Sequence, residues 1–451
     1  MKAAFHTLGC KVNQYETEAM KEQFIEAGYE IVGEEDFADV YVINTCTVTN
    51  LADRKSRQYI RRMKKQSPDA IVAVTGCYAQ VKPEELEAMP EVDIVTGTGE
   101  KNTLLGYIEE FERERTKQRH IRDYDDLVEY EDKGIITSME SRTRAYIKIQ
   151  EGCDRFCAYC LIPFARGHVR SRDPEEVVAE AKALVDAGFK EIILAGINTA
   201  LYGTEESFDY PLLAGEDGMK GIEIIIKRIN DLDGDFRIRL SSLEPTVINA
   251  EYVSRLMKYP RLCPHLHLSI QSGSDNVLKL MNRHYSRQEY LDIVKVLKSY
   301  DPGYGITTDI IVGFPGETQE DFMDSVDMIQ RVEFCKVHGF RYSSREGTAA
   351  ASLPGHLSGT VKNERIQQLL DAGDEAMNRF FDGCIERGEV RTVLFEEYDS
   401  SEDGEEKLIT GYTENYIKIY AQGTDADLNC FKKVKLLKKY KDGMKGEIIH
   451  G

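Results

Sequence analysis

The sequence lacks long apolar runs, a secretory signal and an excess of positive charge. No stretch approaches the roughly 18 apolar residues of a membrane helix, and the opening MKAAFHTLGC has no signal-peptide pattern. We therefore expect a cytoplasmic protein with no membrane partner, whose thiols stay reduced and form no disulfides. The formal charge of -20 excludes a protein that coats nucleic acid nonspecifically, because such binding depends on neutralising phosphates.

Positive charge is concentrated in two patches. Arg54 to Lys65 (RKSRQYIRRMKK) carries seven basic residues and no acid, and Lys432 to Lys445 (KKVKLLKKYKDGMK) carries seven lysines against one aspartate. Each patch is either an RNA contact or a solvated face of a helix or strand, and composition alone leaves both open. With 451 residues, of which 41% are apolar, the chain is long enough for two or three domains with their own cores.

Three cysteines stand close together in the segment QEGCDRFCAYCLIPFARGHVRSR. Cys153, Cys157 and Cys160 form a C-x3-C-x2-C run. An iron-sulfur cluster normally takes four thiolates and a structural zinc takes four protein ligands, so three cysteines leave one metal position open. A zinc site is the main alternative, but the run lacks a second C-x2-C pair, and the nearby His168 has no spaced partner. We favour a cluster with one open iron.

The first segment alternates strand and helix patterns. Apolar and β-branched runs predict strands at 2–7, 40–44, 71–75 and 92–95, and helical periodicity predicts helices at 13–27 and 52–65. This rhythm is typical of an α/β domain with a doubly wound, open parallel sheet. A cysteine follows each of the first three strands: Cys10, Cys46 and Cys77. Because the carboxyl ends of parallel strands share one edge, we expect a second cluster site there, again with one open iron.

The middle of the chain contains six strand-and-helix units. Predicted strands cover 144–149, 191–194, 237–240, 265–270, 305–312 and 336–342. Six such units fit a partial, TIM-like (βα)6 barrel whose strand ends face one mouth. Four polar residues near that mouth are candidates for cofactor binding: Arg170, Asn198, Glu244 and Gln271. Taken alone, each strand end is compatible with an ordinary βα turn, but their shared position around the cysteine run favours the binding role.

The last segment changes character again. Short strands are predicted at 391–397, 407–410, 417–421, 432–436 and 447–450, which indicates a small five-stranded β-barrel of OB-like proportions. Such barrels commonly bind nucleic acid along one face. We predict four parts in all: a cluster domain at 1–112, a charged linker at 113–140, the partial barrel at 141–378 and the small barrel at 379–451.

Taken together, the motifs resemble one family. The C-x3-C-x2-C run is similar to that of the radical S-adenosylmethionine (SAM) superfamily. The segments LGCKVNQYETE, NTCTVTN, VTGCYAQ, RLSSLEP, HLSIQSGSDNVLKLMNRHY and DIIVGFPGET resemble the radical SAM methylthiotransferases over nearly the whole chain. The resemblance implies an N-terminal cluster domain, a radical SAM barrel and a C-terminal, RNA-binding TRAM domain.

The resemblance also implies the cofactors and their ligands. Two 4Fe-4S clusters are expected, one held by Cys10, Cys46 and Cys77 and the other by the catalytic residues Cys153, Cys157 and Cys160. SAM would bind the open iron of the second cluster, and the four polar candidates at the barrel mouth would contact it. The remaining cysteines match no motif and are expected to be core or incidental thiols.

Within the family, LGCKVNQYETE is similar to the branch that acts on N6-threonylcarbamoyladenosine next to the tRNA anticodon. The resemblance implies that a methylthio group is added to C2 of this adenine. One SAM would methylate sulfur on the first cluster, and a second would be cleaved at the other cluster to activate the base. The implied partners are tRNA, a sulfur donor and an electron donor such as a flavodoxin or ferredoxin.

Two kinds of alternative stay open. The same chemistry acts in related branches on isopentenyladenosine in tRNA or on a ribosomal protein side chain, although those branches typically carry C-Q-M-N-like and L-G-C-P-K-N runs. A protein of a different class, a noncatalytic zinc- and RNA-binding protein, would use the same cysteines as structural ligands.

Overall fold

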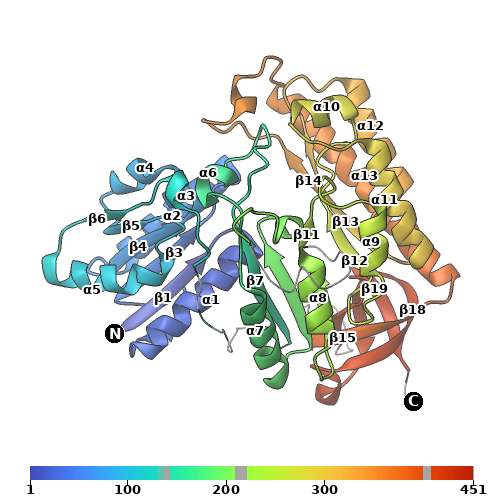
Figure 1. Cartoon of the computed structure of the whole chain (residues 1–451), viewed down its shortest axis with the longest axis horizontal. Helices are drawn as coiled ribbons and strands as arrows, with labels where there is room; N and C mark the ends of the chain where they lie inside the picture. Colours follow the sequence, from blue (N-terminus) through green and yellow to red (C-terminus); the bar gives the residue numbers. More distant parts are fainter. Residues whose placement is uncertain (132–133, 135, 137–142, 209–220, 400–407, 450–451) are drawn as a thin grey trace.

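The structure is a computed structural model of the chain, and it describes residues 1–131, 134, 136, 143–208, 221–399 and 408–449. Three parts succeed one another: an open parallel sheet, a larger partial barrel and a small closed barrel. Figure 1 shows the N-terminal part in blue and cyan beside the green and yellow barrel, with the C-terminal part in red. The α/β fold class predicted from the sequence is confirmed.

The first part is a six-stranded parallel sheet with helices on both faces. In spatial order its strands are β2 (Glu30–Val32), β1 (Lys2–Thr7), β3 (Val40–Thr45), β4 (Ile71–Gly76), β5 (Ile94–Thr96) and β6 (Gln118–His120). Its helices are α1 (Lys11–Glu26), α2 (Asn50–Gln66), α3 (Cys77–Val81), α4 (Pro83–Glu87) and α5 (Leu104–Glu114). The strand order changes direction between β1 and β3, and folds of this kind bind ligands at the carboxyl edge of that switch point.

Strand β3 shows why helices cover both faces of this sheet. Val40 and Val42 pack on one face with Phe24 of α1, and Ile43 packs on the other with Ile60 of α2. A strand that is buried on both faces needs a continuous apolar run, which is the pattern that predicted it. The doubly wound open sheet is therefore confirmed.

The sequence does not predict the two edge strands of the sheet. β2 and β6 have three residues each and include polar side chains such as Gln118 and Arg119. An edge strand has one neighbour and needs no continuous apolar run, so periodicity does not reveal it. β6 pairs with β5 through Val95 and Arg119, and the sheet therefore extends beyond residue 112 into the segment that we expected to be a linker.

The described residues of the middle part form six main parallel strands with helices outside them, and two further strands of two residues each, β8 (Arg170–Ser171) and β11 (Ser242–Leu243). The strands are β7 (Arg144–Glu151), β9 (Glu191–Gly196), β10 (Arg237–Leu240), β12 (His265–Leu268), β13 (Gly305–Val312) and β14 (Lys336–Arg341). The helices that follow the first five are α7 (Pro174–Asp186), α8 (Ile222–Asn230), α9 (Ala250–Leu256), α11 (Arg287–Tyr300) and α12 (Gln319–Val332). β10, β9 and β7 pair in one sheet and β12, β13 and β14 in a second, which an isolated bridge from Ile238 to Leu262 connects to β10. The predicted partial (βα)6 barrel is confirmed.

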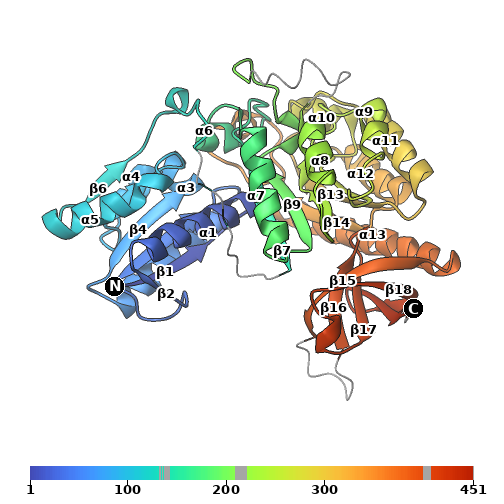
Figure 2. The same ribbon diagram turned by 60° about the horizontal axis from the view of Figure 1, so that its bottom comes forward.

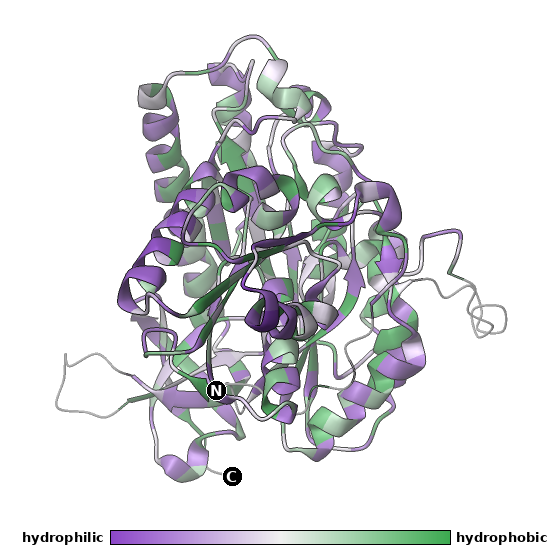
Figure 3. Cartoon of the chain, turned by 90° about the vertical axis from the view of Figure 1, so that its left-hand side faces the viewer, coloured by the Kyte–Doolittle hydropathy of each residue, from purple (hydrophilic) through white to green (hydrophobic). Residues whose placement is uncertain are grey.

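Burial fixes which side of each element faces the barrel core. The strands contribute fully buried aliphatic side chains to one continuous core, among them Ile147, Leu194, Ile238, Leu266 and Ile306. The helical ribbons in Figure 3 are banded purple and green, as expected for helices with one apolar face against the sheet. None of the helices in the described ranges combines the length and the apolar character that crossing a membrane requires.

One long helix connects the partial barrel to the small barrel. α13 (Gly359–Glu386) contributes Leu369 and Ala376 to the larger core and Phe381 and Cys384 to the smaller one. Figure 2 shows α13 above the red strands of the small barrel. The boundary that we expected at residues 378 and 379 therefore falls inside a continuous helix.

The small barrel is closed and has five strands. In order around the barrel they are β15 (Val390–Tyr398), β16 (Leu408–Thr413), β17 (Lys418–Gln422), β19 (Gly443–Ile448) and β18 (Phe431–Tyr440). This confirms the predicted five-stranded barrel. Residue 407, where the second of the predicted strands begins, lies outside the described residues.

Candidate functional site

The structure brings Cys10, Cys46 and Cys77 to the carboxyl edge of the first sheet. They follow β1, β3 and β4, which are adjacent strands around the switch point. Glycines keep the backbone close to these thiols: a Cβ on Gly9 would lie 2.9 Å from the Cβ of Cys46. Gly76 has a φ of +96°, and a Cβ there would lie 2.5 Å from the Thr45 carbonyl oxygen. Larger residues at either position would push the cysteine-bearing turns apart.

The three thiols are close enough to influence one another. Burial, and then the neighbouring Cys77 and Cys10 thiols, raises the pKa of Cys46 to about 12. Such thiols stay protonated at neutral pH until a cation replaces the proton. In the described part of the chain no three cysteine, histidine or carboxylate side chains converge on a single metal position. An iron-sulfur cube binds each thiolate at a different iron, so ligands spread around a larger volume suit it.

A buried network of charges lies beneath Cys77. Arg166, which is fully buried, donates from Nε to Cys77 Sγ at 3.2 Å and from Nη1 to Glu16 Oε1 and Glu151 Oε1 at 2.6 Å each. Lys148 donates to the same two carboxylates, at 3.0 Å to Glu16 and 2.6 Å to Glu151, and Lys101 also pairs with Glu16. This network joins α1 of the first part to β7 and the cysteine loop of the second.

The network has a positive excess on the side of Cys77. It contains four cations, Lys101, Lys148, Arg166 and Arg170, against the two carboxylates Glu16 and Glu151. Burial raises the pKa of Glu151, but Lys148 and Arg166 outweigh it and hold this pKa well below its usual range, so the carboxylate is charged. Buried cations in excess of the carboxylates that they share call for another anion. A cluster bound through three thiolates supplies negative charge at this place, so these residues fit such a group.

The second triad lies on a tight loop that leaves the carboxyl end of β7. Gly152 has a φ of +72°, and a Cβ there would lie 1.7 Å from the His168 carbonyl oxygen. The N–H of Cys153 donates to the Gly167 carbonyl at 3.1 Å, and the N–H of Cys160 donates to the Cys157 carbonyl at 2.9 Å. These bonds fold the backbone into a compact loop, in which burial and then the Cys157 thiol raise the pKa of Cys153. Burial raises the pKa of Cys160 to about 12, and the Cys157 thiol adds to the effect.

Polar groups at the barrel mouth surround this loop. Glu244 accepts from Arg283 Nη1 at 2.6 Å and from Asn198 Nδ2 at 2.5 Å. Burial raises the pKa of the Cys157 thiol, and Arg283 opposes this effect, which places the guanidinium near the second triad. Among the described residues Asn198 Oδ1 and Arg283 Nε are buried without a hydrogen-bond partner. Orphaned buried polar atoms beside a carboxylate fit the amino, carboxylate and hydroxyl groups of SAM.

The other two sequence candidates occupy different positions. Gln271 lies just beyond β12 with a φ of +64°, and its backbone bonds to the Asp309 carbonyl at 2.9 Å and the Ile311 N–H at 2.8 Å. Arg170 is buried against the Leu127 carbonyl and lies 3.7 Å from Glu151. The structure therefore brings Asn198 and Glu244 together but directs the guanidinium of Arg170 into the charge network beneath Cys77.

A short helix links the two triads. α6 (Ile162–Arg166) begins next to Cys160, whose Sγ accepts from the Ile162 N–H at 3.4 Å, and ends at Arg166, which bonds to Cys77. Thr98 of the first part donates to the Ala165 carbonyl at 2.8 Å and fixes this helix against the sheet edge. Both triads are thus attached to the same five-residue element.

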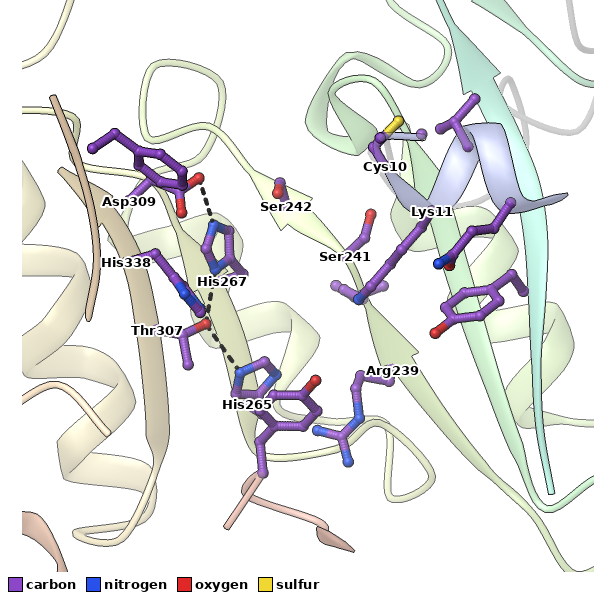
Figure 4. A pocket seen from close by; sticks show the side chains of 18 residues that line it. Cys10, Lys11, Arg239, Ser241, Ser242, His265, His267, Thr307, Asp309 and His338 are labelled. Atoms are coloured by element: carbon purple, nitrogen blue, oxygen red, sulfur yellow. Dashed lines mark hydrogen bonds and ion pairs between the residues drawn. The ribbon is translucent and has the colours of Figure 1, made fainter. Parts of the chain in front are cut away.

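A cavity of about 610 Å³ opens between the first sheet and the inner wall of the barrel. Figure 4 shows Cys10 and Lys11 on one side and His265, His267 and Asp309 on the other. Burial, and then the Arg239 guanidinium, lowers the pKa of Lys11 to about 8. The cavity therefore has charged groups on both walls and extends from Cys10 of the first triad to the inner strands of the barrel.

Three residues important to the site were missed by sequence reasoning. Arg166 and Arg283 belong to the motif segments FARG and MNRHY, but neither follows a strand directly. Their positions depend on tertiary contacts: Arg166 bonds to Glu16, 150 residues away, and Arg283 bonds to Glu244, 39 residues away. Lys11 follows Cys10 immediately, and that adjacency is the one signal that points to it.

A three-cysteine loop at the mouth of a partial (βα)6 barrel defines a radical SAM protein. The family model described as "Radical SAM superfamily" matches residues 147–329, and one described as "Uncharacterized protein family UPF0004" matches residues 2–97. Among solved structures, the radical SAM methyltransferase TsrM from Kitasatospora setae has a TM-score of 0.54 at 16% identity, covering 75% of this chain and 72% of that one. That likeness supports the fold.

Named relatives identify the family within this class. The threonylcarbamoyladenosine tRNA methylthiotransferase MtaB of Bacillus subtilis is 45% identical, covering 96% of this chain and 93% of its own. The Aquifex aeolicus protein of the same name is 39% identical, covering 94% and 97%. A tRNA-2-methylthio-N(6)-dimethylallyladenosine synthase from Moorella thermoacetica is 36% identical, covering 81% of each chain. The chain belongs to the radical SAM methylthiotransferase family.

Proposed function

We propose that this protein is a tRNA methylthiotransferase that adds a methylthio group to C2 of N6-threonylcarbamoyladenosine next to the anticodon. The observation that carries the proposal is the attachment of both cysteine triads to α6, through Cys160 at its start and Arg166 at its end. The substrate is supported by the identity, over nearly the full chain, to proteins named for threonylcarbamoyladenosine.

The six motif cysteines form two separate cluster sites. Cys153, Cys157 and Cys160 would hold the catalytic cluster, and Cys10, Cys46 and Cys77 would hold the second. When bound, the two 4Fe-4S clusters and SAM supply the radical chemistry and the methylthio group. Adenine C2 carries no acidic proton, so acid-base chemistry by side chains does not reach it.

The protein's own residues position and desolvate these groups. Asn198, Glu244 and Arg283 form a connected set at the barrel mouth that would orient SAM beside Cys157. Gln271 adds a polar group at the same mouth, whereas Arg170 acts through Glu151 on the buried network. Arg166 holds the Cys77 thiolate and excludes water from the base of the first site, because it is fully buried.

The small barrel is the proposed tRNA contact. On β18 the ammonium groups of Lys433, Lys435 and Lys438 are exposed. Part of each basic patch is paired with acids: on α2 these pairs are Arg57 with Glu85, Arg61 with Glu91, Arg62 with Glu35 and Lys64 with Asp93, and on β18 they are Lys432 with Asp427 and Lys439 with Asp382. The exposed lysines of β18 are therefore available to neutralise phosphates.

We also propose the domain boundaries, the cellular location and the other partners of the protein. We keep the division into 1–112, 113–140, 141–378 and 379–451 as the proposed domain scheme, with β6 belonging to the first sheet and α13 shared between the barrels. The protein would act in the cytoplasm, where tRNA is found, and would depend on a sulfur donor and an electron donor such as a flavodoxin or ferredoxin.

Nucleoside analysis of tRNA from a strain that lacks this protein tests the substrate. We expect the 2-methylthio form of threonylcarbamoyladenosine to disappear and the unthiolated nucleoside to accumulate, while any methylthio-isopentenyladenosine stays unchanged. Mass spectrometry of digested tRNA measures all three, and re-expression of the protein is the control. If the methylthio form persists with no paralogue to account for it, the proposed substrate is wrong.

A further inference from the structure

The cavity beside Cys10 contains a cation that makes no ion pair among the described residues. Lys11 extends into it from the start of α1 (Figure 4), and among the described residues its ammonium group makes no ion pair. The nearest aromatic ring, that of Tyr146, has its centroid 5.8 Å away. Arg239, the other cation of the cavity, is already paired with Glu191 at 2.9 and 3.0 Å. Lys11 is therefore available to an anionic ligand.

Two further polar groups in this cavity have no partner in the described structure. They are Ser241 Oγ and His265 Nδ1, on residues that are only 8% and 4% exposed. Burial lowers the pKa of His265 well below its usual range, so its ring is neutral and offers one donor and one acceptor. Leaving buried polar atoms without partners is costly, so these atoms indicate that a ligand with matching hydrogen-bonding groups binds here.

His267, Thr307 and Asp309 on the opposite wall already bond to one another. His267 Nδ1 lies 2.8 Å from Thr307 Oγ1 and its Nε2 lies 3.2 Å from Asp309 Oδ2, which fixes the ring. Lys11, Ser241 and His265 each bring to the cavity a group that makes no hydrogen bond or ion pair among the described residues. They present one positive charge and two hydrogen-bonding atoms, which is the pattern that an amino-acid carboxylate and hydroxyl require.

We propose that this cavity binds the N6 substituent of the modified adenine, with Lys11 pairing with the threonyl carboxylate and Ser241 and His265 bonding its other polar groups. The inference rests on the proposed function and adds to it a site for substrate selection. Adenine C2 and N6 flank the same N1 edge, so a base presented to sulfur beside Cys10 directs its N6 group to the same side. A cavity of about 610 Å³ lies within the usual range for small-molecule sites.

The same groups explain discrimination against an isopentenyl substituent. A hydrocarbon chain would leave Lys11, Ser241 and His265 buried without partners, and a site built for polar groups rejects an analogue that lacks them. Lys11 is thus a specificity-determining residue, separate from the cysteines that carry the reaction.

Binding of three anticodon stem-loops to the reconstituted protein tests this inference. One carries threonylcarbamoyladenosine, the second its primary amide in place of the carboxylate, and the third unmodified adenosine. We expect the wild-type protein to bind the first about 10- to 100-fold more tightly than the amide, the scale of a charge-assisted hydrogen bond. Lys11→Gln should abolish this ratio, and Lys11→Arg should retain part of it.

Two control variants show whether a lost preference for the carboxylate reflects substrate selection, and not misfolding or the loss of a cluster. Lys182→Gln removes an ammonium that pairs with Asp186 on the surface of α7 and should keep the wild-type ratio. Ser241→Ala tests the cavity from a wall that bears no cysteine, and we expect it to lower the ratio by about 3- to 10-fold, the scale of one hydrogen bond. Iron content is measured for every variant.

The outcomes are distinct. If both Lys11→Gln and Ser241→Ala discriminate between the acid and its amide as the wild type does, the inference is overturned. A wild-type protein that methylthiolates threonylcarbamoyladenosine but shows no preference for the carboxylate also overturns it, and the proposed function survives. If the wild-type protein does not methylthiolate this nucleoside, the proposed function itself is wrong.

Discussion

Replacing Cys157 with alanine is expected to abolish both the formation of 5'-deoxyadenosine and the methylthiolation of tRNA, whereas Cys46→Ala should lose only methylthiolation. Cys157 belongs to the triad beside Glu244 and Arg283, where SAM would bind. Cys46 belongs to the triad at the sheet edge, whose base is closed by Arg166. The two thiols therefore serve separable halves of the reaction.

Chromatography of 5'-deoxyadenosine and mass spectrometry of tRNA nucleosides measure the two halves in one reaction mixture. Both products should fall to background with Cys157→Ala, and the first should stay near the wild-type level with Cys46→Ala. Cys430→Ala is the matched control, since Cys430 is a half-buried thiol outside both triads. If the Cys46→Ala protein still methylthiolates tRNA fully, the proposed cluster site at Cys10, Cys46 and Cys77 is wrong.

Arg166→Met is expected to lower the free energy of unfolding of the junction between the first sheet and the barrel by about 3–5 kcal/mol. Arg166 contacts Glu16, Glu151, Asn13 and Cys77 while fully buried. Its removal leaves two buried carboxylates with fewer partners and a thiol without its donor. Breaking a buried charge network from one side costs far more than loss of a surface pair.

Hydrogen exchange of peptides that span α1 and α6 measures this effect locally, which suits a chain of several domains that need not unfold in one step. The control is Arg331→Gln, because Arg331 is half-exposed and lies 3.8 Å from Asp327, where about 0–1 kcal/mol is expected. Equal protection in Arg166→Met and the control would show that the network does not hold the junction together.

The sequence predicts the strands that are buried on both faces and misses those that are not. β3 and β13 carry the long β-branched runs of interior parallel strands, so their positions follow from periodicity. β2 and β6 are short edge strands with polar residues, and only their pairing partners identify them. The predicted boundary at residues 378 and 379 falls inside α13, because the two ends of this helix pack into different cores. That packing depends on tertiary contacts, which the sequence does not reveal.

The candidate site likewise contains residues whose positions the sequence predicts and residues whose positions it does not. Cys10, Cys46 and Cys77 follow strands directly, so the topology of a parallel sheet predicts that they meet at one edge. Asn198 and Glu244 also follow strands, and the structure brings them together. Arg170 lies beside the motif in sequence, but Leu127 and Glu151 hold its guanidinium elsewhere. Charge partners that come from distant segments are set by packing and leave no local pattern.

The most direct test of the account is the reaction of the purified protein, reconstituted anaerobically with iron and sulfide, with SAM, a reductant and an anticodon stem-loop that carries threonylcarbamoyladenosine. We expect about eight iron atoms per chain, which corresponds to two 4Fe-4S clusters. We also expect a nucleoside product in which a methylthio group replaces the C2 hydrogen. A protein that binds zinc without iron or acid-labile sulfide, or that holds both clusters and methylthiolates only isopentenyladenosine, would contradict it.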